Sequence, residues 1–267
     1  TFINNNQFVF QYEGFEENNP IYKMYPFETT CSLDKLYFDE KDEIIKKILF
    51  FKNRKDWHKN RGKPYTFGLC LHGPPGTGKT SFQKAIAKML DRHLIIVDIS
   101  KIKNQRIADE IFFSKKINGL NIPYDKRIYV FPEFDTMLPK LTNKRVSINN
   151  IENKKSKEEK DLNNNIIEKL LTKKNVSKTA ENNPLNLSKL LNILDGIPER
   201  TGQIIIIDTN FPENIDDAIL RPGRIDQIIE FKKINSINLK KLICNFFENE
   251  DYDFQDVKFE ERKYTPA

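Results

Sequence analysis

Short apolar runs alternate with stretches of helical spacing along most of the chain. The runs are rich in branched aliphatic and aromatic side chains, which is typical of strands buried on both faces. They cover residues 67–71, 94–97, 127–131 and 203–207. Between the first two runs, apolar residues of the segment 79–90 recur at helical spacing. The alternation predicts an α/β fold in which helices flank a parallel sheet.

The N-terminal part of the chain follows a different pattern. Residues 7–12 alternate between apolar and polar as a strand does, whereas residues 13–26 predict irregular structure. We therefore expect residues 1–32 to be the tail of a preceding β-containing domain or a linker, and residues 33–231 to form the large domain. The first residues show neither an initiating Met nor a signal-peptide pattern, so we expect a piece of a longer protein.

Helical spacing returns near the C-terminal end. The apolar side chains that repeat there are Leu239, Leu242, Ile243, Phe246 and Phe247. Their spacing predicts a helix. We expect this helix to be the first of a small helical lid domain, of which residues 232–267 are only the beginning.

The net charge of +6 is concentrated in one polar stretch. Residues 140–185 contain 11 basic and 6 acidic side chains, many asparagines and few aromatics. This composition predicts a mobile insertion. A solvated loop is favoured over a nucleic-acid contact, because no aromatic side chains interleave the lysines to stack on bases. The sequence also lacks a run of about 18 apolar residues, so a membrane anchor would have to come from an upstream segment.

The cysteines give a weaker indication of the compartment. Cys31, Cys70 and Cys244 are odd in number and share no CxxC spacing, which argues against a disulfide framework or a zinc site. We expect reduced, buried thiols. Such thiols favour a reducing intracellular compartment.

One segment predicts nucleotide binding directly. It reads Gly73-Pro74-Pro75-Gly76-Thr77-Gly78-Lys79-Thr80, with Ser81 next, and fits the pattern GxxxxGK[ST] between a predicted strand and a predicted helix. The glycines let the backbone approach phosphate oxygens, and the helix N-terminus favours negative charge. Lys79 is expected to reach the β- and γ-phosphates, and the Thr80 hydroxyl to reach Mg²⁺. The sequence therefore predicts ATP with Mg²⁺ as the ligand, rather than a Gly/Pro turn with a solvated lysine.

The end of the strand at 127–131 is the candidate for catalysis. Hydrolysis needs one acid near the metal and one that orients or deprotonates water. Glu133 stands where the water-activating carboxylate is expected, but Pro132 occupies the usual place of the metal-linked acid. Asp135, Asp98 or water must then complete the Mg²⁺ site. The alternative interpretation of Glu133 and Asp135 is an exposed acidic strand end.

Two further features lie beyond the last apolar run. Asn210 is expected beside the second strand end, where its amide can bond the attacking water or the γ-phosphate. Arg221 and Arg224 flank a Pro-Gly turn. Taken alone, these arginines predict only surface salt bridges.

Together, the loop at 74–80, the pair Thr209-Asn210 and the segment 220–226 resemble the AAA family of ring-forming ATPases. The segment 220–226 reads Leu-Arg-Pro-Gly-Arg-Ile-Asp. Within that family, the segments 57–65 and 190–197 are similar to the mitochondrial assembly ATPases of the bc complex, which translocate the folded Rieske protein. The resemblance covers about residues 33–231, apart from the insertion.

The resemblance implies specific roles and partners. Lys79 would bind the nucleotide and Thr80 the metal. Glu133 would be the catalytic carboxylate and Asn210 the residue called sensor 1. Arg221 and Arg224 would be arginine fingers. The fingers would act on the ATP of a neighbouring subunit, so a homo-oligomeric ring, hexamer or heptamer, is implied. A remodelled or translocated protein substrate and a mitochondrial location are implied by the same analogy.

Two other functions stay open. Pro132 leaves room for an ATP-sensing scaffold that does not hydrolyse ATP. The basic insertion leaves room for a motor acting on nucleic acid, although this is disfavoured.

Overall fold

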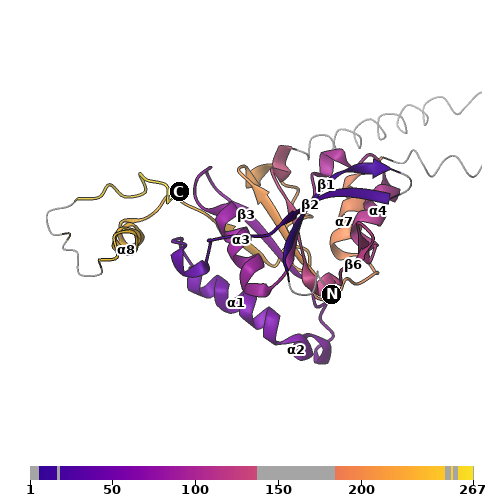
Figure 1. Ribbon diagram of the computed structural model, residues 1–267, viewed down its shortest axis with the longest axis horizontal. Helices are drawn as coiled ribbons and strands as arrows, with labels where there is room; N and C mark the ends of the chain where they lie inside the picture. The colour runs from indigo at the N-terminus through magenta and orange to yellow at the C-terminus, as the bar shows by residue number, and fades with distance from the viewer. Residues whose placement is uncertain (1–5, 17–18, 137–183, 250–253, 255–257, 267) are drawn as a thin grey trace, which may run out of the picture.

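The computed structural model describes residues 6–16, 19–136, 184–249, 254 and 258–266. These residues form a seven-stranded sheet of order β2-β1-β4-β7-β8-β3-β9 (Figure 1). Its strands are β1 (Phe8–Glu16), β2 (Asn19–Pro26), β3 (Phe67–His72), β4 (His93–Ile96), β7 (Arg127–Phe131), β8 (Ile204–Thr209) and β9 (Gln227–Glu230). The pairings from β1 to β9 are parallel, and β2 alone runs antiparallel to its neighbour. A separate ribbon pairs β5 (Lys116–Ile117) with β6 (Leu120–Asn121).

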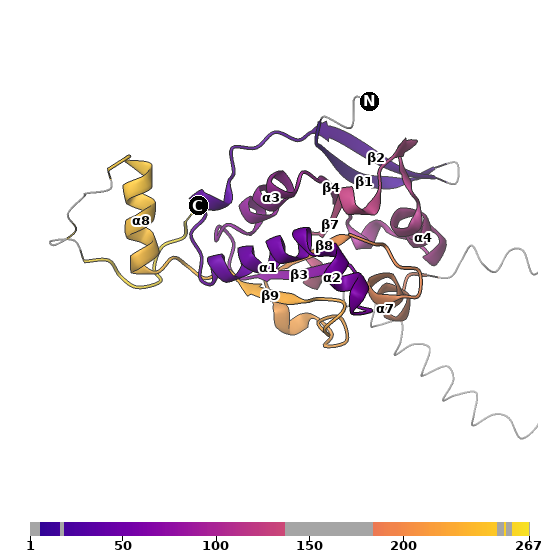
Figure 2. The same cartoon turned by 90° about the horizontal axis from the view of Figure 1, so that it is seen from below.

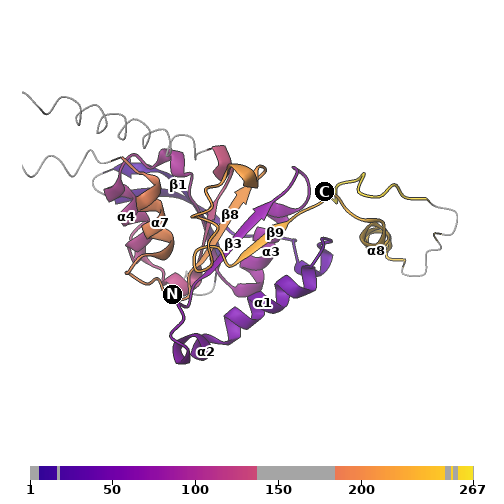
Figure 3. The same ribbon diagram turned by 180° about the vertical axis from the view of Figure 1, so that it is seen from behind.

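Helices cover both faces of the sheet. The described part of the chain contains α1 (Lys41–Asn53), α2 (Lys55–Asn60), α3 (Lys79–Leu90), α4 (Gln105–Phe113) and α7 (Leu187–Asp195), together with α8 (Ser236–Phe246), which lies to one side of the sheet. Figures 2 and 3 show α1 and α3 on one face and α4 and α7 on the other. The two hydrophobic clusters follow the same division. The predicted α/β fold with a mostly parallel sheet is confirmed.

The strand β8 shows why apolar runs predicted the central strands. Ile204 and Ile206 pack in the cluster of α1 and α3, whereas Ile205 and Ile207 pack in the cluster of α4 and α7. Because both faces are buried, every position favours an aliphatic side chain. The four predicted central strands and the helix at 79–90 are confirmed to within two residues at each end.

The prediction for the N-terminal segment is wrong in part. Residues 13–26 were expected to be irregular, yet Asn19–Pro26 is strand β2, which pairs with β1. Tyr22 is the only buried side chain of β2, so tertiary pairing rather than alternation defines this strand. Since β1 pairs in parallel with β4, the boundary expected at residue 33 does not separate two sheets.

The C-terminal helix α8 confirms the helical spacing of 239–247, and every residue of α8 is at least partly exposed. It lies to one side of the sheet (Figures 1 and 3). The chain then returns, and the Ile234 amide donates to the Tyr264 carbonyl at 2.9 Å. The insertion predicted at 140–185 lies outside the described residues, except for its last two positions. Within the described part, no helix is long and apolar enough to cross a bilayer.

Candidate active site

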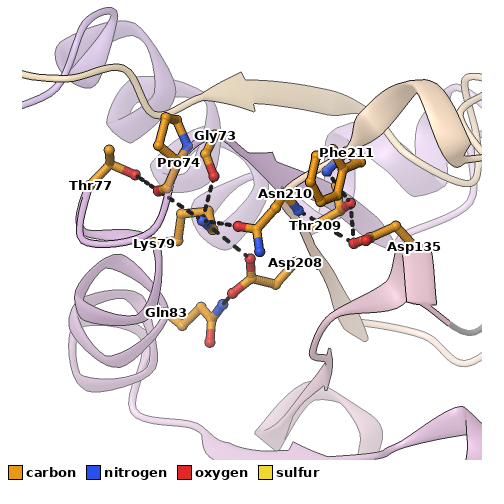
Figure 4. Close-up of polar contacts among 10 residues, drawn as sticks. All are labelled: Gly73, Pro74, Thr77, Lys79, Gln83, Asp135, Asp208, Thr209, Asn210 and Phe211. Carbon is orange, nitrogen blue, oxygen red and sulfur yellow. Dashed lines mark hydrogen bonds and ion pairs between the residues drawn. The ribbon is translucent and has the colours of Figure 1, made fainter. Parts of the chain in front are cut away.

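The predicted phosphate loop connects β3, which ends at His72, to α3, which begins at Lys79 (Figure 4). Gly73, Gly76 and Gly78 have φ angles of 135°, 76° and 100°, a region that favours glycine. The first N–H groups of a helix have no acceptor inside it. The loop therefore brings unshielded backbone and the positive end of α3 to one place, as phosphate binding requires.

Gly73 is also required by packing. A Cβ at this position would overlap the backbone oxygen of Phe231. Phe231 follows β9, and its amide donates to the His72 carbonyl at 2.7 Å. The edge strand therefore holds the start of the loop in place.

The ammonium group of Lys79 is buried under the loop. Its Nζ donates to the carbonyls of Gly73 at 2.7 Å and Pro74 at 3.2 Å, and to Asn210 Oδ1 at 2.9 Å. Asp208 Oδ1 lies 4.0 Å away. The loop carbonyls and the strand β8 thus hold this cation in place at the N-terminal end of α3 (Figure 4).

A cavity of about 370 Å³ opens beside the lysine. It is lined by Pro75, Gly76, Thr77, Gly78, Lys79, Thr80, Ser81, Pro132, Glu133, Asp208, Thr209 and Asn210. The structure therefore brings the loop, Glu133 and Asn210 together, as predicted. Asp135, Arg221 and Arg224 are described but do not line this cavity.

Glu133 follows β7 in a left-handed conformation with φ at 47°. A non-glycine residue in this region carries strain of about 1–3 kcal/mol, which often marks a functional position. Its carbonyl accepts from the Thr136 amide at 3.1 Å and from the Thr136 hydroxyl at 2.8 Å, so the turn is closed by η5 (Phe134–Thr136). The side chain is exposed and lines the cavity, where it can act on water.

Asp135 lies behind the cavity rather than in it. Its Oδ1 accepts from the Thr209 hydroxyl at 2.5 Å and from the Asn210 amide at 3.4 Å. Thr209 Oγ1 in turn accepts from the Phe211 amide at 3.0 Å. These contacts fix the end of β8 and hence the place of Asn210, while the metal role of Asp135 stays a prediction.

Asp208 was not among the predicted site residues. Its side chain is 17% exposed and accepts from Gln83 Nε2 at 2.9 Å. Burial raises the pKa of this carboxyl, although Lys79 and the Gln83 hydrogen bond oppose the rise. The signal in the sequence was an aliphatic run that ends in Asp-Thr-Asn, three polar residues at the edge where the loop also lies.

The two arginines differ in their surroundings. Arg224 pairs with Asp195 at 3.2 Å and donates to the Ala218 carbonyl at 2.5 Å, while Arg221 is exposed. Two hydrogen bonds of 2.8 Å between Gly68 and Asp226 tie their loop to β3. The loop is therefore a fixed platform from which Arg221 faces solvent.

A second, smaller cavity of about 50 Å³ adjoins the loop on the side of α8. Thr77, Gly78 and Ser81 line both cavities. The other lining residues include Leu36, Tyr37, Phe38, Phe231, Leu242 and Pro266. This lining is mostly apolar and aromatic, with Lys35 beside it, and none of these residues was assigned to the site from the sequence.

A family model supplies the decisive comparison. Residues 69–233 match the model of the "ATPase family associated with various cellular activities (AAA)". The chain belongs to the AAA family. The matched range begins in β3 and includes the phosphate loop, the ends of β7 and β8, and the loop that carries Arg221 and Arg224.

Curated relatives agree with this assignment and are consistent with the predicted subgroup. AAA-ATPase At5g40000 of Arabidopsis thaliana is 30% identical over 251 residues, which are 90% of this chain and 47% of that protein. AAA-ATPase ASD, mitochondrial, of the same plant is 29% identical, with 90% and 46% covered. The probable mitochondrial chaperone BCS1-B of Dictyostelium discoideum is 29% identical, with 84% and 47% covered. The chain thus spans about half the length of these relatives.

The side chains at the cavity fit the Mg²⁺ that AAA proteins typically use with nucleotide. Mg²⁺ prefers oxygen ligands and is commonly held by one or two protein groups together with phosphates and water. Thr80 and the carboxylates of Glu133 and Asp208 offer such oxygens. Among the described residues, no group of three or more His, Cys, Asp or Glu side chains could hold a metal ion alone.

Proposed function

We propose that this chain is an ATP-hydrolysing module of a ring oligomer that remodels or translocates a protein partner. The observation that supports it is the convergence of Lys79, Glu133 and Asn210 on one cavity beside the phosphate loop. A smaller, partly apolar cavity adjoins this one, because Thr77, Gly78 and Ser81 border both.

Each polar residue then has a distinct task. Lys79 exchanges the carbonyls of Gly73 and Pro74 for phosphate oxygens. The backbone amides of the loop bind the same phosphates. Thr80 contributes its hydroxyl to Mg²⁺, which neutralises phosphate charge when bound. Glu133 accepts a proton from the attacking water, and Asn210 orients that water or the γ-phosphate.

A second subunit completes the proposed site. Arg221 and Arg224 lie outside the cavity of their own chain, and Arg221 is exposed on its platform. An arginine that reaches the phosphates of a neighbour adds to Lys79 a second positive charge that stabilises the transition state. This division between subunits supports a homo-oligomeric ring.

The proposed protein substrate and mitochondrial association rest on the relatives. One is described as a probable mitochondrial chaperone and another as a mitochondrial AAA-ATPase. A motor on nucleic acid has less support, because no aromatic side chains interleave the lysines of residues 140–185 to stack on bases.

Pro132 supports one competing function. It lines the cavity at the end of β7 without offering a side-chain oxygen, so a scaffold that senses ATP without hydrolysis is the second candidate. Steady-state phosphate release by the assembled oligomer separates the two functions. A wild type that binds nucleotide but releases no phosphate favours the scaffold.

The variant Glu133→Gln tests the proposed catalytic step. Loss of a general base lowers phosphate release by roughly 10²–10⁴-fold, whereas binding of a fluorescent ATP analogue is retained. Glu110→Gln, which removes an exposed acid on α4, is the matched control and keeps the wild-type rate. Release at the wild-type rate by Glu133→Gln would contradict the assigned role.

A further inference from the structure

The strands β7 and β8 end side by side at the cavity. A proline follows β7 at the position where β8 has an aspartate. Phe131 pairs with Ile207 in parallel register. The residues that follow this pair, Pro132 and Asp208, therefore occupy the same edge of the sheet, and both line the cavity. Where β7 offers no side-chain oxygen, β8 provides a carboxylate one strand closer to the phosphate loop.

The Asp208 carboxylate points toward Lys79 and Gln83 (Figure 4). Its Oδ2 is fixed by Gln83 from the first turns of α3. Its Oδ1 lies 4.0 Å from Lys79 Nζ, and no described residue donates a hydrogen bond to that oxygen. A mostly buried carboxylate oxygen without a donor is costly unless it has another partner.

A hydrogen bond to Lys79 does not account for Asp208. The ammonium group has three donors. All three have acceptors within 3.2 Å, in the carbonyls of Gly73 and Pro74 and the amide oxygen of Asn210. Asp208 Oδ1 lies 4.0 Å from that group, which is beyond hydrogen-bonding distance, so this oxygen can also accept a second cation.

Asp135, the acid predicted from the sequence, is less suited to a metal. Its Oδ1 accepts from Thr209, and its side chain does not line the cavity. Glu133 lines the cavity but is needed to accept the proton of water in the proposed function. Asp98, the other predicted candidate, accepts from Ser100 and does not line the cavity, so Asp208 is the remaining carboxylate of the lining.

We propose that Asp208 is the protein carboxylate that holds the Mg²⁺ of bound nucleotide, in place of the acid absent at Pro132. Gln83 is its positioning residue, and Thr80 supplies the hydroxyl on the other side of the cavity. This inference rests on the proposed function, because it requires ATP in the cavity.

The test compares nucleotide affinity with and without metal. The dissociation constant of a non-hydrolysable ATP analogue is measured by calorimetry, first with excess Mg²⁺ and then with EDTA, so the readout does not depend on turnover. In the wild type, Mg²⁺ tightens binding. In Asp208→Asn, that tightening falls by roughly 10–100-fold, the usual loss when a group that supports a metal is removed. The metal-free affinity is unchanged or higher, because a charge that repels phosphates is gone.

Asp91→Asn is the matched control. Asp91 ends α3 at the far end from the loop, has φ at 53°, and forms an exposed pair with Lys126. Asparagine tolerates this backbone conformation well. The control therefore removes the same charge and keeps the full effect of Mg²⁺.

The double variant Pro132→Asp/Asp208→Asn tests whether a carboxylate at the end of β7 can replace the one on β8. Restored tightening by Mg²⁺ supports the proposal, and tightening that stays absent overturns the claim that one position replaces the other. Full tightening in Asp208→Asn alone, or equal weakening with and without metal, also overturns it. Asp208→Ser repeats the measurement if the asparagine variant does not fold. A wild type that binds no analogue in either condition refutes the proposed function instead.

Discussion

Gly73→Ala tests how tightly the phosphate loop is built into the sheet. Gly73 has φ at 135°, which strains any other residue. An added Cβ would also overlap the Phe231 oxygen and lie 3.0 Å from the Phe231 carbonyl carbon. Both atoms belong to the backbone, so neither can rotate away. The neighbouring Phe231 amide bonds His72, which ties any shift to the pairing of β3 with β9.

The two costs have comparable size. Backbone strain of this kind costs about 1–3 kcal/mol. Forcing an extra carbon into a packed site costs a further 1–3 kcal/mol, roughly. The expected loss of unfolding free energy is their sum, about 2–6 kcal/mol. At about 2–4 °C per kcal/mol for a domain of this size, the Tm falls by roughly 4–24 °C.

Thermal unfolding without nucleotide measures this loss, and Gly119→Ala is its control. Gly119 has φ at 77°, but open space surrounds the position of its Cβ. The control therefore pays only the strain, and Gly73→Ala should melt below it. Equal melting temperatures of the two variants would show that the contact with Phe231 costs nothing, and an unchanged Gly73→Ala would refute the reasoning on both counts.

Two further predictions concern titratable groups. Because burial raises the pKa of Asp208, its stabilising contribution is present at low pH and is lost as pH rises through the raised pKa. Asp208→Asn should therefore gain Tm over the wild type between acid and neutral pH, and a gain that shrinks as pH rises would contradict this sign. Burial raises the pKa of Cys70 to about 12, so a thiol reagent at mildly alkaline pH should modify partly exposed Cys31 and Cys244 in the native protein and spare Cys70. Labelling of Cys70 as fast as Cys31, followed by mass spectrometry, would show that β3 opens readily.

The sequence predicted those parts of the fold in which local pattern and tertiary environment agree. The strand β8 is buried on both faces, so its isoleucines identify it without knowledge of its neighbours. The strand β2 has one buried side chain, Tyr22, and its pairing with β1 comes from tertiary contacts. Such an edge strand leaves little periodic signal in its own residues.

The same distinction applies to the site. The phosphate loop is contiguous, so its glycines and Lys79 could be recognised together. The contacts of Asp135 with Thr209 and of Asp208 with Gln83 join residues 74 and 125 positions apart. No spacing rule connects such pairs. Only the order of the strands in the sheet brings them together.

The neighbouring ends of β7 and β8 bear on how AAA proteins that lack an acid of the usual pair are classified. A search for an acid pair at the end of one strand finds Pro132 and would label the chain a pseudoenzyme. The sheet places Asp208 at the adjacent strand end, far away in sequence and facing the same cavity. Inactivity is therefore better judged by the residues around the cavity than by a gap in a linear motif.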